Sequence, residues 1–217
     1  MTHLSLSAPE LTLDPTPPAL HSISQINFYS GAPALNRLSF HRHSSALLDA
    51  HLGHRLTVFV ALSDGAPLVS TSDGSLALLG WDEVGPLLGG KDKGAPWFEA
   101  DGEGKTRHLQ GARRKDIPPL VFLGTDERSA SETERTLLVR DPSPSENTSN
   151  PPVFALDTSG LTPELLEPIL KKERAFFDSR KAAMAFKPWE AGVFAQARSM
   201  VDWNARNKVG FSFLPLK

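Results

Sequence analysis

The order of the apolar segments constrains the fold of this chain more than any other feature of its sequence. Before Thr162 the apolar runs are short and rich in β-branched and aromatic residues, which is typical of strands. After Thr162, which can cap a helix with Pro163 in the first turn, apolar residues recur at helical spacing. Strands grouped before helices fold into segregated layers. The sequence therefore predicts an α+β fold, with a mainly antiparallel sheet followed by two C-terminal helices.

The predicted strands are short apolar segments bounded by polar or turn-forming residues. The segment at residues 56–62 is nearly continuous in apolarity, so we expect it near the centre of the sheet. A Ser-Asp-Gly turn at residues 63–65 indicates a hairpin with the next strand. Helices are predicted over residues 44–52, with a serine cap, and over residues 162–186 and 188–207. The predicted strands are Ile26–Tyr29, Leu56–Leu62, Leu68–Ser70, Leu76–Leu79, Trp97–Ala100, Leu120–Leu123 and Val153–Leu156.

The chain is expected to form one domain with polar segments around and within it. Residues 1–24 are rich in Pro, Ser and Thr and are predicted to be a disordered leader. Residues 25–208 are predicted to form the domain, with flexible insertions near residues 101–116 and 126–150. Residues 209–217 do not complete the last helix with polar residues but continue with apolar ones, and we interpret them as an aberrant tail.

Composition excludes several classes of protein. With 40% hydrophobic and 22% charged residues, the sequence is typical of a soluble globular protein. The formal net charge of −2 gives no general attraction to nucleic acid or to anionic membranes. No apolar run approaches the roughly 18 residues that a membrane-spanning helix needs. We therefore expect no nucleic-acid partner, no membrane association and a cytoplasmic location.

A glycine-rich segment at residues 102–106, Gly-Glu-Gly-Lys-Thr, invites comparison with a phosphate-binding loop. That loop requires a glycine five residues before Gly104, and Glu99 occupies the position. The flanking residues 97–100 and 108–109 instead predict two strands of a hairpin with a solvated turn between them.

Histidines and basic residues form two further clusters. For His41, His43, His51 and His54, the favoured interpretation is exposed histidines near a helix end, where the helix dipole favours positive charge. A metal site is the alternative, and it needs further ligands and a second shell. The basic run at residues 113–115 is interpreted as a solvated loop rather than a nucleic-acid patch.

Four segments in the same order resemble one known family. They are residues 28–37, Phe122-Leu123-Gly124, Phe154-Ala155-Leu156-Asp157, and the helical pattern of residues 195–203. Together they resemble the rudimentary Nudix-like N-terminal domain of NADH pyrophosphatases, Nudix superfamily hydrolases, of the fungal type. The sequence Trp-Asn-Ala-Arg-Asn-Lys at residues 203–208 is similar to the segment that precedes the zinc ribbon in that family.

The resemblance implies an activity that this sequence lacks the residues to perform. The family hydrolyses the pyrophosphate of NAD(H) to nicotinamide mononucleotide and AMP, using Mg²⁺ or Mn²⁺ on a helix-borne box of carboxylates, and it carries a structural zinc held by four cysteines. The present sequence contains no cysteine and no such box. We therefore assign no catalytic, cofactor-binding or metal-binding residue, expect no cofactor in this chain, and predict that it is inactive alone.

The chain is expected to be truncated before the zinc ribbon and the catalytic domain. Two interpretations stay open: a dimerisation or binding module without an enzymatic role, and a truncated gene product. Full-length fungal relatives can be peroxisomal, but this sequence carries no such signal.

The resemblance also implies a homodimer, because the N-terminal domains of the family contribute to assembly. The interface residues we predict are Phe194, Trp203, Phe211 and Phe213. Phe194 is also expected to pack, with Ala197, against its own domain. The other aromatic residues of the helical region are expected to pack against the sheet, to line a pocket or, for part of the set, to form a surface that covers the missing hydrolase domain or a partner subunit; they are Phe176, Phe177, Phe186 and Trp189.

Overall fold

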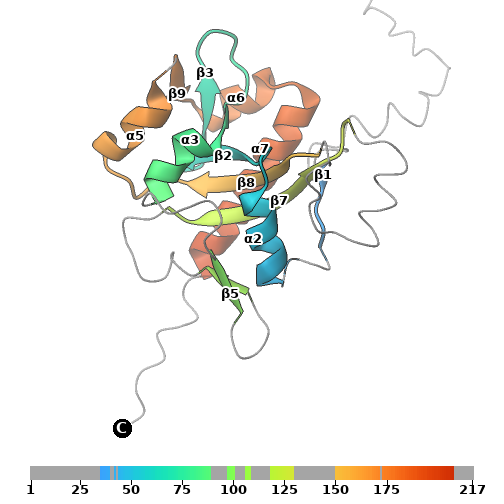
Figure 1. Cartoon of the computed structure of the whole chain (residues 1–217). Helices are drawn as coiled ribbons and strands as arrows, with labels where there is room; N and C mark the ends of the chain where they lie inside the picture. The colour runs from blue at the N-terminus through green and yellow to red at the C-terminus, as the bar shows by residue number, and fades with distance from the viewer. Residues whose placement is uncertain are drawn as a thin grey trace, which may run out of the picture.

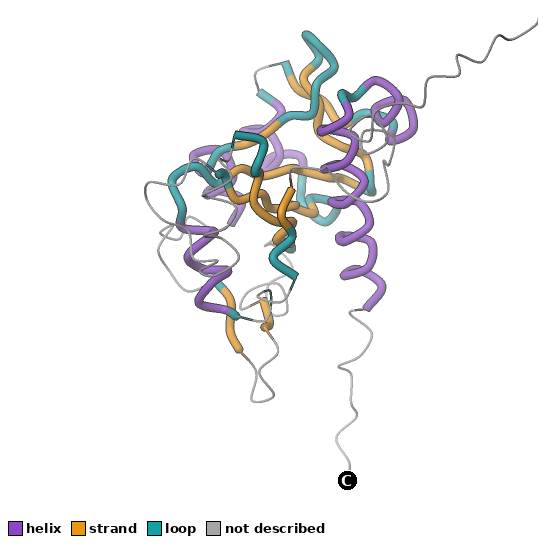
Figure 2. Tube along the Cα trace, turned by 90° about the vertical axis from the view of Figure 1, so that its right-hand side faces the viewer, coloured by secondary structure: helices purple, strands orange, loops and turns teal. Residues whose placement is uncertain are grey.

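A computed structural model shows a sheet between two helical layers. Viewed from the side, α2 (Ser45–Gly53) and α7 (Pro188–Asn207) lie on opposite sides of the sheet (Figure 2). The described residues are 35–39, 42, 44–88, 97–100, 106–108, 118–129, 150–171 and 173–207.

The sheet has seven described strands in the order β1-β7-β8-β2-β3-β9, and β4 pairs with β2 beside this path (Figure 1). The four longest, β2, β3, β7 and β8, correspond to predicted strands, as does the short β4. The bounds are β1 Leu35–Asn36, β2 Val58–Ser63, β3 Ala66–Ser70, β4 Leu78–Leu79, β7 Leu120–Asp126, β8 Pro152–Asp157 and β9 Arg174–Phe176.

The α+β class is confirmed, but the expectation of a mainly antiparallel sheet needs correction, because the sheet is mixed. β2 and β8 run parallel, with partners from Val58 and Val153 to Leu62 and Asp157. The reason is the placement of β7: β8 turns back antiparallel to β7 and inserts between β7 and β2. The apolar pattern of each segment marks a strand but carries no information on its direction.

The hairpin predicted around the glycine-rich segment is present. β5 (Phe98–Ala100) pairs antiparallel with β6 (Thr106–His108) in a separate two-stranded sheet. Other sequence predictions fall outside the described residues: the strand at 26–29, the leader at 1–24, the tail at 209–217 and most of the insertion at 126–150.

The predicted long helix over residues 162–186 is wrong. The chain instead forms α5 (Pro163–Leu170), then β9, then α6 (Ser179–Ala185). The helix ends at Leu170, because its C-cap residue Lys171 has an extended backbone with a ψ of 160°, and Glu173 follows with a φ of 56°, in the left-handed region. The chain then joins the sheet as β9, and Asp178 starts α6 by accepting a hydrogen bond from the Lys181 amide at 2.9 Å.

The remaining helices agree with the sequence. Ser44 caps α2 by accepting a hydrogen bond from the Leu47 amide at 3.3 Å, and the helix ends at Gly53. A short helix α3 (Trp81–Val84) continues into the 3₁₀ helix η1 (Gly85–Leu88). In the described part of the chain, no helix combines the length and apolarity required to cross a membrane.

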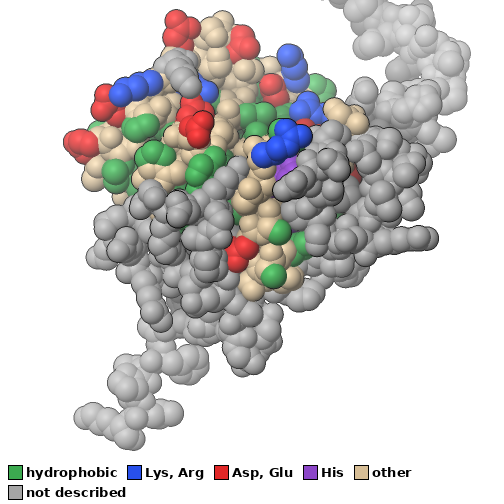
Figure 3. Space-filling view, viewed as in Figure 1, with side chains coloured by type: hydrophobic (Ala, Val, Ile, Leu, Met, Phe, Trp, Pro, Cys, Tyr) green, Lys and Arg blue, Asp and Glu red, His purple; other side chains and the backbone are tan. Residues whose placement is uncertain are grey.

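Apolar side chains fill both spaces between the sheet and the helices. One cluster lies on the side of α2, α3 and α5 and includes Phe59, Phe122 and Phe154. The other lies under α6 and α7 and includes Val60, Val153 and other small or β-branched residues. On the face seen in Figure 3, acidic and basic side chains of the described residues are interspersed rather than gathered by sign.

Candidate functional site

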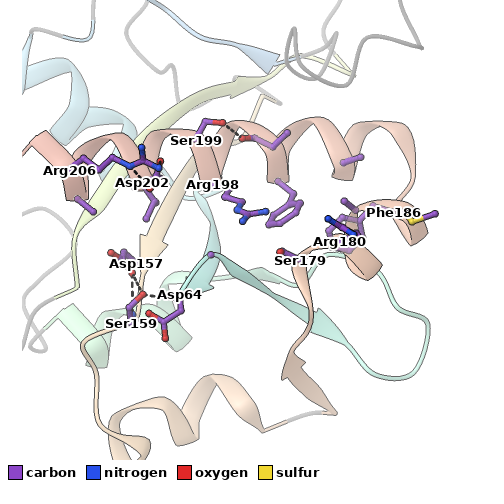
Figure 4. A pocket seen from close by; sticks show the side chains of 18 residues that line it. Asp64, Asp157, Ser159, Ser179, Arg180, Phe186, Arg198, Ser199, Asp202 and Arg206 are labelled. Atoms are coloured by element: carbon purple, nitrogen blue, oxygen red, sulfur yellow. Dashed lines mark hydrogen bonds and ion pairs between the residues drawn. The ribbon is translucent and has the colours of Figure 1, made fainter.

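A groove of about 1000 Å³ lies between helices α6 and α7 and the ends of strands β2 and β8 (Figure 4). This size falls in the range of small-molecule sites. Its charged and hydroxyl side chains come from the β2–β3 turn, the segment after β8, and the two helices. They are Asp64, Asp157, Ser159, Ser179, Arg180, Arg198, Ser199, Asp202 and Arg206.

The groove runs along the side of α7 that lies next to the buried apolar stripe of this helix. Phe194, Ala197 and Val201 are buried against the sheet, as expected from the sequence, and Arg198 and Asp202 follow on the adjacent side of the helix. Phe194 and Phe186 are also among the residues that line the groove, although both are buried. Their rings meet edge to face, with centroids 5.7 Å apart.

One end of the groove is acidic and is organised by a tight turn. Asp64 and Gly65 both have positive φ, 51° and 76°, as in the two-residue turns that suit β-hairpins. The Ser159 hydroxyl accepts a hydrogen bond from the Asp64 amide at 2.8 Å and donates one to Asp157 at 2.6 Å. The Asp157 carboxylate also accepts from the Ser159 amide at 3.1 Å. These contacts fix the backbone around both carboxylates.

The other side of the groove is basic. Arg180 projects from α6 and Arg198 from α7 (Figure 4). A Cβ atom added to Gly65 would lie 3.3 Å from Nε of Arg198, so the guanidinium lies directly against the turn backbone. Arg206 is paired with Asp202, with Nη2 and Oδ2 2.7 Å apart. Within the described residues, neither Arg180 nor Arg198 forms an ion pair.

This arrangement suits binding better than covalent chemistry. The Ser159 hydroxyl hydrogen-bonds a carboxylate, and the Ser199 hydroxyl donates to the Ala195 carbonyl at 2.8 Å. No histidine is among the described residues that line the groove, so neither hydroxyl has an imidazole base there.

The metals used by the resembled family do not fit the described residues. Among them, no group of three or more His, Asp or Glu side chains gathers as a metal site would require. We therefore assign no reaction step to Mg²⁺, Mn²⁺ or Zn²⁺ at the described residues.

A second polar feature lies at the β7 edge of the sheet, outside the groove. Arg42 donates from Nε to the Arg37 carbonyl at 2.8 Å, and its guanidinium lies 5.6 Å from the Phe122 ring centroid. Burial lowers the pKa of Arg42 to about 10, with a smaller contribution from the positive charge of Arg37. Arg42 therefore stays charged near neutral pH and ties the segment before α2 to β7.

The structure explains why the Phe-Leu-Gly segment ends in a glycine, Gly124. Its φ is 147°, and it lies at an irregularity in the pairing of β7 with β8. A Cβ atom at this position would come within 2.1 Å of the Asn36 carbonyl oxygen in β1. Beside it, the Gln196 side chain of α7 donates to the Leu123 carbonyl at 2.7 Å. The glycine therefore permits β1 to approach the sheet.

The histidine interpretation needs correction. His51 and His54 are buried, 1% and 7% exposed, and not exposed at the helix end. The His51 ring stacks on Phe122, with centroids 5.1 Å apart, because α2 lies against the sheet. His54 is the C-terminal cap of α2, and its backbone amide donates to the His51 carbonyl. His41 and His43 lie outside the described residues.

The four predicted interface residues do not share one environment. Phe194 is 3% exposed and belongs to the core, whereas Trp203 is 60% exposed on α7. Phe211 and Phe213 lie outside the described residues, as do residues 101–105 of the glycine-rich segment and the basic run at 113–115. The interface role of these residues stays a prediction.

The region that carries this groove also matches a known protein family. Residues 56–203 match the family model of the NADH pyrophosphatase-like rudimentary NUDIX domain. The chain belongs to this family. The matched region of the rudimentary NUDIX domain runs from just before β2 to Trp203 in α7, so it contains most of the groove lining. No curated protein matches the chain.

Sequence reasoning did not find the groove. Its charged residues come from segments far apart in the sequence, from Asp64 to Arg206, and only the fold brings them together. The available signals were the Asp-Gly turn and the arginine on the side of α7 next to its apolar stripe.

Proposed function

We propose that this rudimentary NUDIX domain is a non-catalytic module of an NADH pyrophosphatase-type protein and that it acts by self-association. On this proposal the chain has no hydrolase activity of its own. The observation that carries the proposal is the arrangement of the carboxylates in the described part of the chain: several make structural contacts, and no group of them gathers as a metal site would require.

The contacts of individual carboxylates support this. Glu83 pairs with Arg174 at 2.8 Å and thereby joins α3 to β9. Asp126 pairs with Arg128 at 2.8 Å, and Asp49 accepts a hydrogen bond from the Trp97 amide at 2.6 Å. Metal-assisted pyrophosphate hydrolysis needs several carboxylate oxygens around one cation. The absence of cysteine from the sequence likewise supports the absence of a four-cysteine zinc ribbon from this chain.

The surface around Trp203 supports the association part of the proposal. The buried stripe of α7 anchors the helix to the sheet, which leaves Trp203 on its outer side at 60% exposure. Large aromatic residues often supply most of the binding energy of an interface. We propose a homodimer in which Trp203 is buried, with Phe211 and Phe213 contributing to the same contact.

A hydrolysis assay tests the catalytic part. The purified chain is incubated with NADH in millimolar Mg²⁺ or Mn²⁺, and nicotinamide mononucleotide and AMP are measured. We expect no release above the buffer blank. Metal-dependent release that disappears when one Asp or Glu is changed to its amide would overturn the proposal.

Sedimentation velocity tests the association part. Trp203→Gln should weaken self-association by about thirtyfold, the effect of losing a hot spot of about 2 kcal/mol. Leu165→Gln is the matched control, because Leu165 is an exposed apolar residue on α5, 38% exposed and away from α7. A wild-type monomer at all concentrations up to about 100 μM, well above the range of specific dimers, would contradict the homodimer.

The cytoplasmic location is also part of this proposal. Fractionation of cells that express the tagged chain tests it, and recovery with an organelle fraction would contradict it.

A further inference from the structure

We propose that the groove between α6 and α7 binds a sugar phosphate, with its phosphate on Arg180 and Arg198 and its hydroxyls on Asp64 and Asp157. Trp203 is not among the residues that line this groove, and the binding proposal does not require the chain to dimerise.

The first step of the argument is the unused positive charge. Arg180 and Arg198 line the same groove, and neither pairs with a carboxylate within the described part of the chain. Arg206, also in the groove, is already neutralised by Asp202 at 2.7 Å. Two guanidinium groups that remain available in one groove favour an anion with several oxygens, because each can form paired hydrogen bonds with it.

The second step is the position of Arg198. The guanidinium lies beside the β2–β3 turn, where a Cβ atom on Gly65 would lie 3.3 Å from Nε and 3.8 Å from Cζ. Gly65 has a φ of 76°, so glycine satisfies both the turn and the space for the arginine. Arg198 therefore lies next to the acidic turn, where one ligand can contact both.

The third step is the separation of charge within the groove. Asp64 and Asp157 lie across from the two helices that carry the arginines, as Figure 4 shows. Ser159 holds both residues, through the Asp64 amide at 2.8 Å and the Asp157 carboxylate at 2.6 Å. Each carboxylate keeps oxygen lone pairs that can accept from hydroxyl groups, as acidic residues do with the ribose hydroxyls of nucleotides.

The fourth step is size. A groove of about 1000 Å³ is much larger than an inorganic phosphate. An anion alone would leave the acidic end of the groove unoccupied. A sugar phosphate combines a phosphate, which fits the arginines, with a hydroxylated body that reaches the carboxylates.

Isothermal titration calorimetry with the whole chain tests the proposal with three probes: ribose 5-phosphate, ribose and inorganic phosphate. We expect ribose 5-phosphate to bind at least about tenfold more tightly than phosphate, the equivalent of one additional good interaction. Ribose alone should show no measurable binding. Equal binding of phosphate and ribose 5-phosphate means an adventitious ion only and overturns the proposal, as does no binding of any probe.

Three variants locate the site. Changing Arg180 and Arg198 together to Gln should weaken ribose 5-phosphate binding by at least about tenfold, since charged hydrogen bonds are lost. Asp64→Asn should weaken ribose 5-phosphate but not phosphate. Lys181→Gln is the matched control: it removes one positive charge from α6, next to Arg180, at a position that does not line the groove.

All variants involve exposed side chains, so circular dichroism should show an unchanged fold. Equal weakening by Lys181→Gln would indicate general charge attraction and contradict the site. Unchanged binding in the double arginine variant would contradict it as well.

Discussion

The two faces of the central sheet are built from alternate residues of the same strands, yet they differ in the size of their side chains. On β8, Phe154 and Leu156 face the cluster beneath α2 and α3, whereas Val153 and Ala155 face the cluster beneath α7. On β2, Phe59 belongs to the first cluster and Val60 to the second, whereas the next pair is reversed in size, with Ala61 in the first and Leu62 in the second. The aromatic side chains of β2, β7 and β8 therefore all lie on one face, and the same strands line the other face with Val, Ala and Leu.

This difference is reflected in how each face of the sheet is covered. Several short elements cover the aromatic face, and their rings contact one another: Phe154 lies 5.1 Å from Phe122 and 6.0 Å from Phe59. The smaller residues of the other face allow a single long helix, α7, to lie close to the sheet. The outer side of that helix then carries the groove and Trp203.

The largest expected effect tests the aromatic face. Phe154→Ala should lower the free energy of unfolding by about 3–5 kcal/mol, because the ring is fully buried and the cavity cannot collapse. Val153→Ala, on the helix face of the same strand, should cost only about 2 kcal/mol. Urea denaturation measures both, and equal losses would contradict the contrast between the faces.

The second-largest expected loss of unfolding free energy concerns the edge of the sheet, where β1 pairs with β7. Gly124→Ala should cost about 3 kcal/mol, because alanine meets the Asn36 carbonyl at 2.1 Å and disfavours a φ of 147°. Hydrogen exchange should show loss of protection at β1 before loss in β2. Gly160→Ala is the control, since a Cβ atom there meets nothing within 4 Å. Retained protection of β1 in Gly124→Ala would contradict the close approach.

A third substitution tests how closely α7 packs on the small-residue face. Ala197→Leu should destabilise the domain by about 2 kcal/mol, since the residue is fully buried and the core has no room for a larger side chain. Ala205→Leu, on the exposed part of the same helix, should change the free energy of unfolding by less than about 0.5 kcal/mol. If Ala197→Leu stabilises the domain, the helix is less closely packed than the burial of Ala197 indicates.

The smallest expected effect on the free energy of unfolding comes from Asp73 in the β3–β4 turn, which belongs to neither face of the sheet. The Asp73 carboxylate accepts hydrogen bonds from the Ser75 hydroxyl at 2.8 Å and the Ser75 amide at 3.1 Å. These bonds lower the pKa of Asp73, the hydroxyl contributing most. Because the pKa of Asp73 is lowered in the folded state, its ionised carboxylate stabilises the fold at pH values above the usual carboxyl pKa. This contribution to the free energy of unfolding is lost as the pH falls through the lowered pKa.

An NMR titration of the Asp73 carboxyl carbon checks this. Its midpoint should lie below that of an unperturbed aspartate, and Ser75→Ala should raise it. A midpoint that does not move in Ser75→Ala would contradict the role of the hydroxyl.

The elements that could be predicted from sequence are those whose pattern is local. The apolar run of β2 and the stripe of α7 needed no knowledge of their neighbours. The break after Leu170 could not be predicted, because the helical spacing of apolar residues continues across it while β9 pairs with a distant strand. The burial of His51 depends on Phe122, and the groove depends on segments that only the fold brings together.

The parallel pairing of β2 with β8 also governs when the domain can fold. The two strands are separated by almost a hundred positions, from Val58 to Val153, and β8 is the strand that joins β7 to β2. Pairings between such distant segments form slowly, because the loop must close before any contact stabilises it. During synthesis, β2 and β7 therefore emerge before the strand that lies between them, and their unpaired edges are open to aggregation until it arrives. The central strand of the sheet is thus the last of its three middle strands to leave the ribosome, so nascent chains that end before residue 157 expose the strand edges that β8 covers in the folded domain.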